Sequence, residues 1–152
     1  MIYVMKGRSI WDCSGTVIFG GKACLGLGTR ISCAGKLEFG NNFRLTAHSS
    51  IICTDYISFG EACLVSWNCL FMDSDLHKIY DQDGDVVNKN RPISIGNDVW
   101  VCSNCIILKG CEISDMNVIA AGTILAGQKI HKSSQVIGTH GSIIKENILW
   151  KP

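Results

Sequence analysis

The sequence predicts an all-β chain folded as a parallel β-helix, and two repeats support this prediction. An aliphatic residue recurs at every sixth position over residues 95–130, in units that begin at Ile95, Val101, Ile107, Ile113, Ile119 and Leu125. Phe-Gly pairs recur every twenty residues, at Phe19, Phe39 and Phe59. No α-helix or amphipathic strand has a period of six, whereas stacked hexapeptide units do. We therefore expect a triangular prism with an aliphatic core.

We expect one domain over residues 1–152, with its elements in a simple order. Residues 1–12, including Ile10 and Trp11, are predicted to cap the first coil, because an uncovered edge invites pairing with another chain. Residues 13–71 are predicted to form the N-terminal coils and residues 93–130 the C-terminal coils. Residues 131–152 are predicted to form a short cap, in which Trp150 packs.

The six-residue rhythm stops after Phe71 and resumes at Ile93. The intervening residues 72–92 are rich in Asp and Asn and contain one histidine, His77. Such a segment cannot stay inside the prism wall, so we predict a loop that projects from it. Long excursions from a rigid repeat are where function usually lies.

Composition excludes several classes of protein. The formal net charge is +1 and no Lys/Arg run occurs, which argues against nucleic acid or an anionic membrane as the main partner. The N-terminus lacks the apolar run of a signal peptide, and we expect no membrane insertion and a cytoplasmic location. The nine cysteines are expected to be reduced, with Cys63, Cys69, Cys105 and Cys111 inside the prism. The Cys102–Cys105 pair has no matching second pair, so no metal is expected.

The chain resembles a known family in three stretches. The D-x-D-x-H of Asp73, Asp75 and His77 precedes RPISIGNDVW, and ILKGCEIS and VIAAGTIL follow. These motifs are similar to those of the hexapeptide-repeat acetyltransferases, particularly those that O-acetylate sugars and surface polysaccharides. The resemblance implies a left-handed β-helix, acetyl-CoA as co-substrate, a sugar or glycan acceptor, and a homotrimer with active sites between subunits.

The resemblance also implies roles for single residues. His77 matches the catalytic histidine and is the expected general base, because imidazole titrates near neutral pH. Asp73 and Asp75 are expected to orient the imidazole or bind acceptor hydroxyls. Trp100 is expected to line the pocket or a subunit interface, and His48 lies near an acceptor-binding position.

Donor binding is implied at Ser103, Ala121 and Gly122, where small residues let the pantetheine arm of acetyl-CoA approach the wall. Lys145 falls on a basic position of the family tail. The chain departs from the family at Ala126-Gly127 and over residues 138–142, where relatives carry lysines. These departures put the contacts to the CoA phosphates in question.

Three alternatives remain open. An N-acetyltransferase acting on an amino sugar would need the same residues. A non-catalytic scaffold or glycan-binding trimer would share the fold, because fold alone does not fix function. A γ-type carbonic anhydrase would need three converging histidines, and no pair among the four histidines of this chain has the spacing expected for that family.

Overall fold

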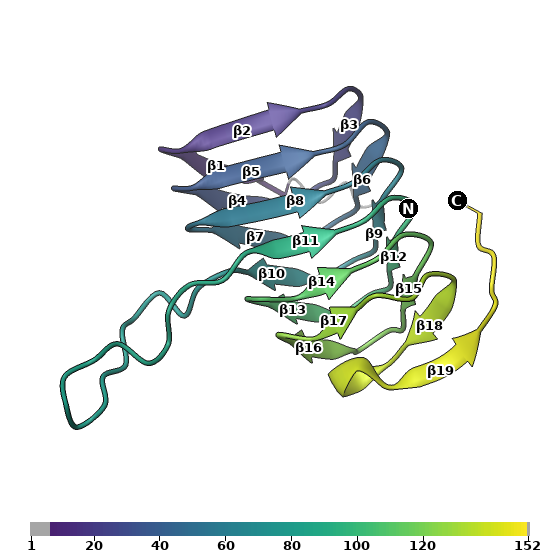
Figure 1. The fold of residues 1–152 in the computed structure, drawn as a ribbon. Coiled ribbons are helices and arrows are strands. Elements are labelled where there is room, and N and C mark those ends of the chain that lie inside the picture. The colour runs from purple at the N-terminus through teal and green to yellow at the C-terminus, as the bar shows by residue number, and fades with distance from the viewer. Residues whose placement is uncertain (1–6, 152) are drawn as a thin grey trace.

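The computed structural model describes residues 7–151, which wind into a left-handed parallel β-helix with three sheets (Figure 1). Apart from the last strand, β19 (Ile143–Glu146), the strands pair in parallel with the equivalent strands of the adjacent coils. The fold predicted from the sixfold repeat is therefore confirmed. The core is the column of side chains that these stacked strands point into the prism.

Each sheet takes one strand from every coil. Sheet A contains β1 (Ile10–Cys13), β4 (Arg30–Cys33), β7 (Ser50–Cys53), β10 (Leu70–Met72), β13 (Ile106–Leu108) and β16 (Ile124–Ala126). Sheet B contains β2 (Thr16–Phe19), β5 (Lys36–Phe39), β8 (Tyr56–Phe59), β11 (Ile93–Ile95), β14 (Glu112–Ile113) and β17 (Lys129–Ile130). Sheet C contains β3 (Ala23–Leu25), β6 (Phe43–Leu45), β9 (Leu64–Val65), β12 (Trp100–Val101), β15 (Val118–Ile119), β18 (Gln135–Ile137) and the antiparallel β19 (Ile143–Glu146).

The chain passes from sheet A to B to C in every coil, so three corners run the length of the prism. We call them the A/B, B/C and C/A corners after the sheets they join. At the C/A corner, Gly28, His48, Asn68, Asn104 and Gly122 have positive φ values in successive coils. Gly and Asn tolerate this left-handed conformation better than other residues, which explains their repeated use there.

The inner column matches the sequence repeat. In sheet A, Phe71 pairs with Ile107 and Ile107 with Leu125, and all three are fully buried. Toward the N-terminal coils the column becomes aromatic, with Phe39 and Phe43 at a ring-centroid distance of 4.5 Å. Aromatic pairs in contact at this distance add to the stabilisation from burial alone.

Buried cysteines fill the inner side of the corners, as predicted for Cys63, Cys69, Cys105 and Cys111. The thiols of Cys63, Cys69 and Cys105 donate to carbonyl oxygens of the next coil, at 3.0 to 3.1 Å. Burial raises the pKa of Cys63 to about 12. These thiols therefore act as small, hydrogen-bonded core residues, and all of them are free.

The ends of the prism differ from the predicted boundaries. Ile10 and Trp11 belong to β1, which pairs with β4, so the first coil begins at Ile10 and not at residue 13. The rest of the predicted N-terminal cap falls largely on residues 1–6, which lie outside the described residues. Val17 of β2 and Leu25 of β3, in this same first coil, pack against the core.

The C-terminal cap also starts later than expected. Residues 131–137 continue the last coil through β18, because Ile130 takes the inward strand position expected for residue 131 and pairs with Ile113 in β14. Gly127, at φ 81°, makes the shortened turn before β17 possible. After β19 the tail runs back along the outer face of sheet C instead of covering the last coil (Figure 1). There Trp150 packs on Trp100.

The predicted excursion is present and leaves the prism at the A/B corner, between β10 and β11 (Figure 1). Its two arms pair through an antiparallel bridge between Tyr80 and Val86. The amide of Arg91 donates to the carbonyl of Asp73 at 3.1 Å, which closes the loop where it meets the wall. Nothing helical in residues 7–151 has the length and apolar character needed to span a bilayer.

Candidate functional site

His77 lies near the base of the projecting loop, with its backbone held on both sides. Its amide donates to the carbonyl of Asp75 at 2.7 Å, and its own carbonyl accepts from Asn88 Nδ2 at 2.7 Å. The side chain is exposed. It lines a cavity of about 500 Å³ together with polar groups that include Thr54, Ser74 and Asn88. The imidazole is thus presented to solvent from a fixed backbone.

Asp75 contributes through a network that ties the loop to the wall. Its Oδ2 accepts from Lys109 Nζ at 2.5 Å and from Asn88 Nδ2 at 2.9 Å. Lys109 Nζ also donates to the carbonyl of Asn88 at 3.0 Å. The hydrogen bond from Lys109, followed by that from Asn88, holds the pKa of Asp75 below its ordinary value. The carboxylate therefore remains charged at neutral pH and fixes the loop on which His77 stands.

Asp73 has a different position from the one expected. It is fully buried, and its two carboxylate oxygens accept the backbone amides of Thr54 and Asp55, each at 2.8 Å. These amides belong to the A/B corner of the preceding coil, which Asp73 closes at the point where the chain leaves the wall. A carboxylate used in this way is not available to an acceptor hydroxyl.

The predicted donor residues gather at the C/A corner. Ser103 and Gly122 stack in successive coils, and the Gly122 amide donates to the Ser103 carbonyl at 3.0 Å. This amide is therefore occupied by the stacking of the coils. Ala121 and Gly122 are exposed, and no atom lies within 4 Å of where a Gly122 Cβ would be. The corner therefore offers an unobstructed backbone edge along its C-terminal coils.

His48 and Trp100 lie on the side of the predicted donor residues rather than beside His77. His48 occupies the C/A corner two coils before Ser103, and its imidazole lies against Gly28 of the coil before it. Trp100 stands on the outer face of sheet C, donates from Nε1 to Ser66 Oγ at 3.0 Å, and contacts Trp150. Lys145 is exposed in β19, opposite Val136.

Within this chain the predicted base and the predicted donor residues are separated by sheet A. Ser103 precedes β13 and His77 follows β10, and these two strands are parallel neighbours. The residue before one strand and the residue after the other therefore lie at opposite ends of the sheet. The structure brings His77 together with Asp75 at the A/B corner, and Ser103 together with Ala121 and Gly122 at the C/A corner, but it does not join the two groups.

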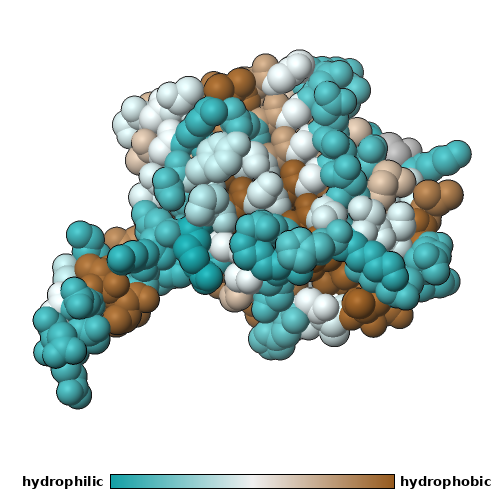
Figure 2. Space-filling view, viewed as in Figure 1, coloured by the Kyte–Doolittle hydropathy of each residue, from teal (hydrophilic) through white to brown (hydrophobic). Residues whose placement is uncertain are grey.

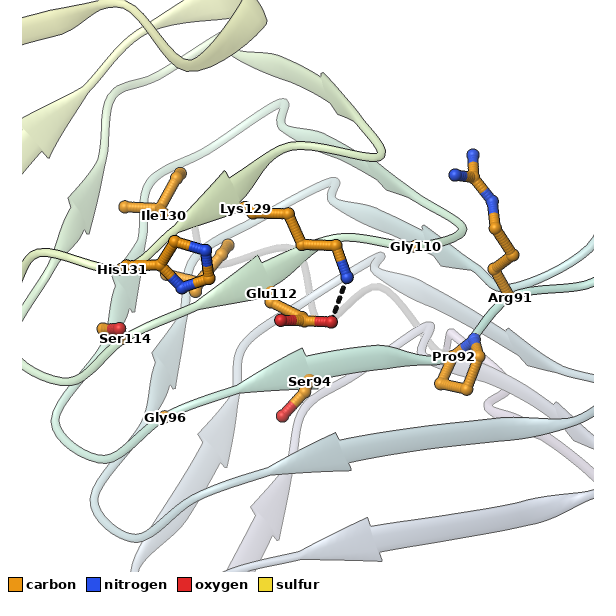
Figure 3. A pocket seen from close by; sticks show the side chains of 11 residues that line it. Arg91, Pro92, Ser94, Gly96, Gly110, Glu112, Ser114, Lys129, Ile130 and His131 are labelled. Atoms are coloured by element: carbon orange, nitrogen blue, oxygen red, sulfur yellow. Dashed lines mark hydrogen bonds and ion pairs between the residues drawn. The ribbon is translucent and has the colours of Figure 1, made fainter.

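A second cavity, of about 700 Å³, opens on sheet B without any of the predicted residues (Figure 3). Glu112 and Lys129 pair at its centre, Arg91 points away from this pair, and His131 lies at the other side. The charges of Glu112 and Lys129 offset one another, which leaves the guanidinium of Arg91 as the uncompensated charge among the residues that line this cavity. No group of three or more His, Cys, Asp or Glu within residues 7–151 is arranged to hold a metal.

Sequence reasoning missed Asn88 and Lys109. Lys109 was visible as the cation just before the Gly110 corner, but its partner lies 34 positions earlier in the chain. Asn88 carried no local signal, because its role depends on the two arms of the loop lying side by side. Contacts between loop arms have no periodicity that a repeat analysis can detect.

Comparison with known proteins agrees with the resemblance found in the sequence. The chain is 33% identical to the polysialic acid O-acetyltransferase of Neisseria meningitidis over 95 residues, or 62% of this chain and 44% of that protein. It is 28% identical to the galactoside O-acetyltransferase of Escherichia coli K12 over 92 residues, or 59% of this chain and 44% of that protein. The matches thus span less than half the length of these curated relatives. No protein-family model matches the chain.

Solved structures share the fold. A galactoside acetyltransferase in complex with coenzyme A superposes with a TM-score of 0.72 at 24% identity, covering 85% of this chain and 64% of that one. A hexapeptide-repeat acetyltransferase of Vibrio cholerae complexed with acetyl-CoA gives 0.69 at 16% identity, covering 87% and 70%. A polySia-specific acetyltransferase gives 0.66 at 21% identity, covering 95% and 78%.

The buried position of Asp73 yields a prediction about stability. Asp73→Asn replaces one acceptor oxygen by an NH₂ group facing a backbone amide, so the free energy of unfolding should fall by about 1–3 kcal/mol. Urea denaturation measures this change. Asp83→Asn, at the exposed loop tip, is the matched control and should change stability by less than about 0.5 kcal/mol. Unchanged stability in Asp73→Asn would contradict the structural role.

The pairing of Asp75 with Lys109 predicts a pH dependence. Because the folded pKa is depressed, the contribution of this pair is present above the unfolded pKa of about 3.9 and is lost as pH falls through the lower folded value. Lys109→Met should raise the pKa of Asp75, as measured by carboxyl NMR titration. Lys78→Met, also at the loop, should not. An unmoved Asp75 titration in Lys109→Met would refute the contact.

Proposed function

We propose that this protein is an acetyl-CoA-dependent O-acetyltransferase that acts on a sugar or glycan acceptor. The observation that carries the proposal is His77, exposed on a rigidly held loop of a β-helix whose opposite corner presents a smooth backbone edge at Ser103, Ala121 and Gly122. The sequence relatives are O-acetyltransferases of polysialic acid and galactosides, which favours a hydroxyl over an amine acceptor. Two of the structural neighbours hold coenzyme A or acetyl-CoA.

The chemistry assigns His77 the role of general base. A sugar hydroxyl is a poor nucleophile at neutral pH, so the imidazole removes its proton as the oxygen attacks the thioester carbonyl carbon. The tetrahedral intermediate collapses by breaking the C–S bond. The imidazolium then returns its proton to the departing thiolate, leaving an acetyl ester and free CoA. No acyl-enzyme is needed, so both substrates are bound together.

Asp75 serves as a positioning residue for this base. Its carboxylate contacts Lys109 and Asn88 rather than the imidazole, and its carbonyl accepts the His77 amide. It therefore sets the direction of the histidine through the loop backbone. Trp100, His48 and Lys145 remain proposed contacts to acceptor and donor from the other side of the site.

The separation of the two half-sites supports a homotrimer. The outer face of sheet A is apolar in its later coils, where Leu70, Met72, Ile106, Leu108 and Ile124 point outward in strands β10, β13 and β16. Three copies with these faces turned to an axis parallel to the prism would bury them. In that arrangement the A/B corner of each protomer meets the C/A corner of the next. The base of one subunit then faces the donor edge of its neighbour.

The projecting loop supports the same assembly. Apolar side chains gather along the loop behind its hydrophilic tip (Figure 2). Leu76, Ile79 and Val87 are each more than half exposed in the single chain. A solvated loop has no reason to expose so much apolar surface, whereas a loop that reaches onto a neighbour does. A cytoplasmic location remains a prediction from the sequence.

His77→Ala tests the general base. Turnover with acetyl-CoA and a galactoside or sialic acid acceptor should fall by about a hundredfold to ten-thousandfold, while CoA binding and the trimer persist. CoA release measures turnover, and calorimetry measures binding. His131→Ala, an exposed histidine outside the site, is the matched control and should retain wild-type rates. Unchanged turnover in His77→Ala would contradict the role of His77 as general base. Absence of CoA binding to the wild type at millimolar CoA would instead favour a non-catalytic scaffold.

Mixed trimers test whether the site lies between subunits. His77→Ala removes the base, and Ala121→Trp blocks the donor edge, so each variant alone should be inactive. Randomly mixed trimers, co-expressed with two affinity tags, should recover about a quarter of wild-type activity, because that fraction of interfaces pairs an intact base with an intact donor edge. Activity that stays at the background of the two variants would place both groups in one protomer.

A further inference from the structure

Trp67 is a large aromatic residue held on the outside of the C/A corner. Its side chain is 64% exposed, although Ser103 and Ala121 take the equivalent places in the next two coils. Its carbonyl accepts the amide of Asn104 at 2.9 Å, and the neighbouring Asn68 donates to Asn104 Oδ1 at 2.8 Å. The backbone that carries the indole is therefore pinned to the following coil, while the ring projects outward.

Nothing in the described chain accounts for this exposure. Trp100 and Trp150 pack on each other, and Trp11 stacks on Phe19, whereas the ring of Trp67 stacks on no aromatic side chain of residues 7–151. An exposed, rigidly mounted indole offers a flat apolar face with one polar N–H. Such a residue commonly contributes binding energy in ligand sites and interfaces.

The position of Trp67 along the prism relates it to the base. Trp67 directly precedes β10 and His77 follows it, so both belong to the same coil. A threefold axis parallel to the prism rotates coils without shifting them along it. The coil that contains β10 in one protomer therefore meets the same coil of the next, and Trp67 comes to the level of the partner subunit's His77. Ser103, which follows β12, lies one coil further on.

This order divides the corner into two parts around the base. The proposed donor edge runs from Ser103 to Gly122, on the C-terminal side of His77. Trp67 lies level with the base and His48 lies one coil before it, both on the side away from the donor edge. The acceptor must be bound on this side if its hydroxyl is to reach the thioester from across the base. The apolar C–H face of a pyranose ring matches the face of an indole, as a planar base does in aromatic stacking platforms.

We propose that Trp67 is the stacking platform for the acceptor's sugar ring and determines the preference for a cyclic acceptor. The inference rests on the proposed function, because it uses the trimer and the direction of the donor edge. It adds an acceptor-binding residue at a position that the sequence repeat marks only as a corner. In this role Trp67 binds the substrate and transfers no proton.

Kinetics with acetyl-CoA and two acceptors, methyl β-galactoside and a sialic acid oligomer, test the proposal. Trp67→Ala should raise the acceptor KM about tenfold or more and leave the KM for acetyl-CoA within about twofold. Trp67→Tyr keeps an aromatic face and should restore most of the loss. Trp11→Ala, a half-exposed tryptophan in the first coil, is the matched control and should not change either KM.

A binding measurement separates failure of this inference from failure of the proposed function. Titration with either acceptor should shift the tryptophan emission of the wild type but not of Trp67→Phe, and light scattering should show an unchanged trimer in both. An acceptor KM that is unchanged in Trp67→Ala, a rise in the acetyl-CoA KM alone, or dissociation of the trimer would overturn the role of Trp67. If the wild type transfers no acetyl group, the proposed function fails, and absence of an emission shift would then reject Trp67 as well.

Discussion

The parallel stacking of coils is the constraint on which the rest of this structure depends. Each strand must present its backbone groups to the same strand one coil away, so a change in one coil is tolerated only where it leaves this register intact. The corners satisfy that condition. At the C/A corner one position in each coil keeps a left-handed backbone, but the residue beside it is Ala47, Trp67, Ser103 or Ala121. Chemical variety is therefore confined to the edges of the prism.

The sequence was sufficient for the parts of the molecule that repeat. The predicted inward positions from Ile95 to Leu125 were correct because buried positions at a fixed spacing show in the sequence as aliphatic residues at every sixth position. The loop was predicted because the six-residue repeat of aliphatic residues is interrupted between Phe71 and Ile93. The register of the last coil was not predicted. A fixed period of six places an inward residue at His131, but in the structure Ile130, one residue earlier, takes that inward position. A local deletion in the backbone leaves the residue types on either side almost unchanged.

The candidate site was less accessible to sequence reasoning. Asp73 and Asp75 look alike in a D-x-D motif, yet one closes a corner in the interior and the other pairs with Lys109 on the surface. The two-residue spacing does not reveal this difference, because it arises where the chain leaves the wall. His77 and Ser103 were both singled out, but only the direction of β10 and β13 shows that sheet A separates them. This separation is the observation on which the proposed trimer rests.

The closure of the loop at its base has a consequence for how such a protein can diversify. Because Asp73 and Arg91 are hydrogen-bonded to each other and to the adjacent coils, the prism is complete without the residues between them. Doubling the length of a flexible loop costs only about 0.6 kcal/mol in closure entropy. Insertions and deletions between Asp73 and Arg91 therefore change the free energy of unfolding of the prism very little. Selection can therefore reshape the loop for new ligands while the wall of the prism, with the proposed donor edge, stays unchanged.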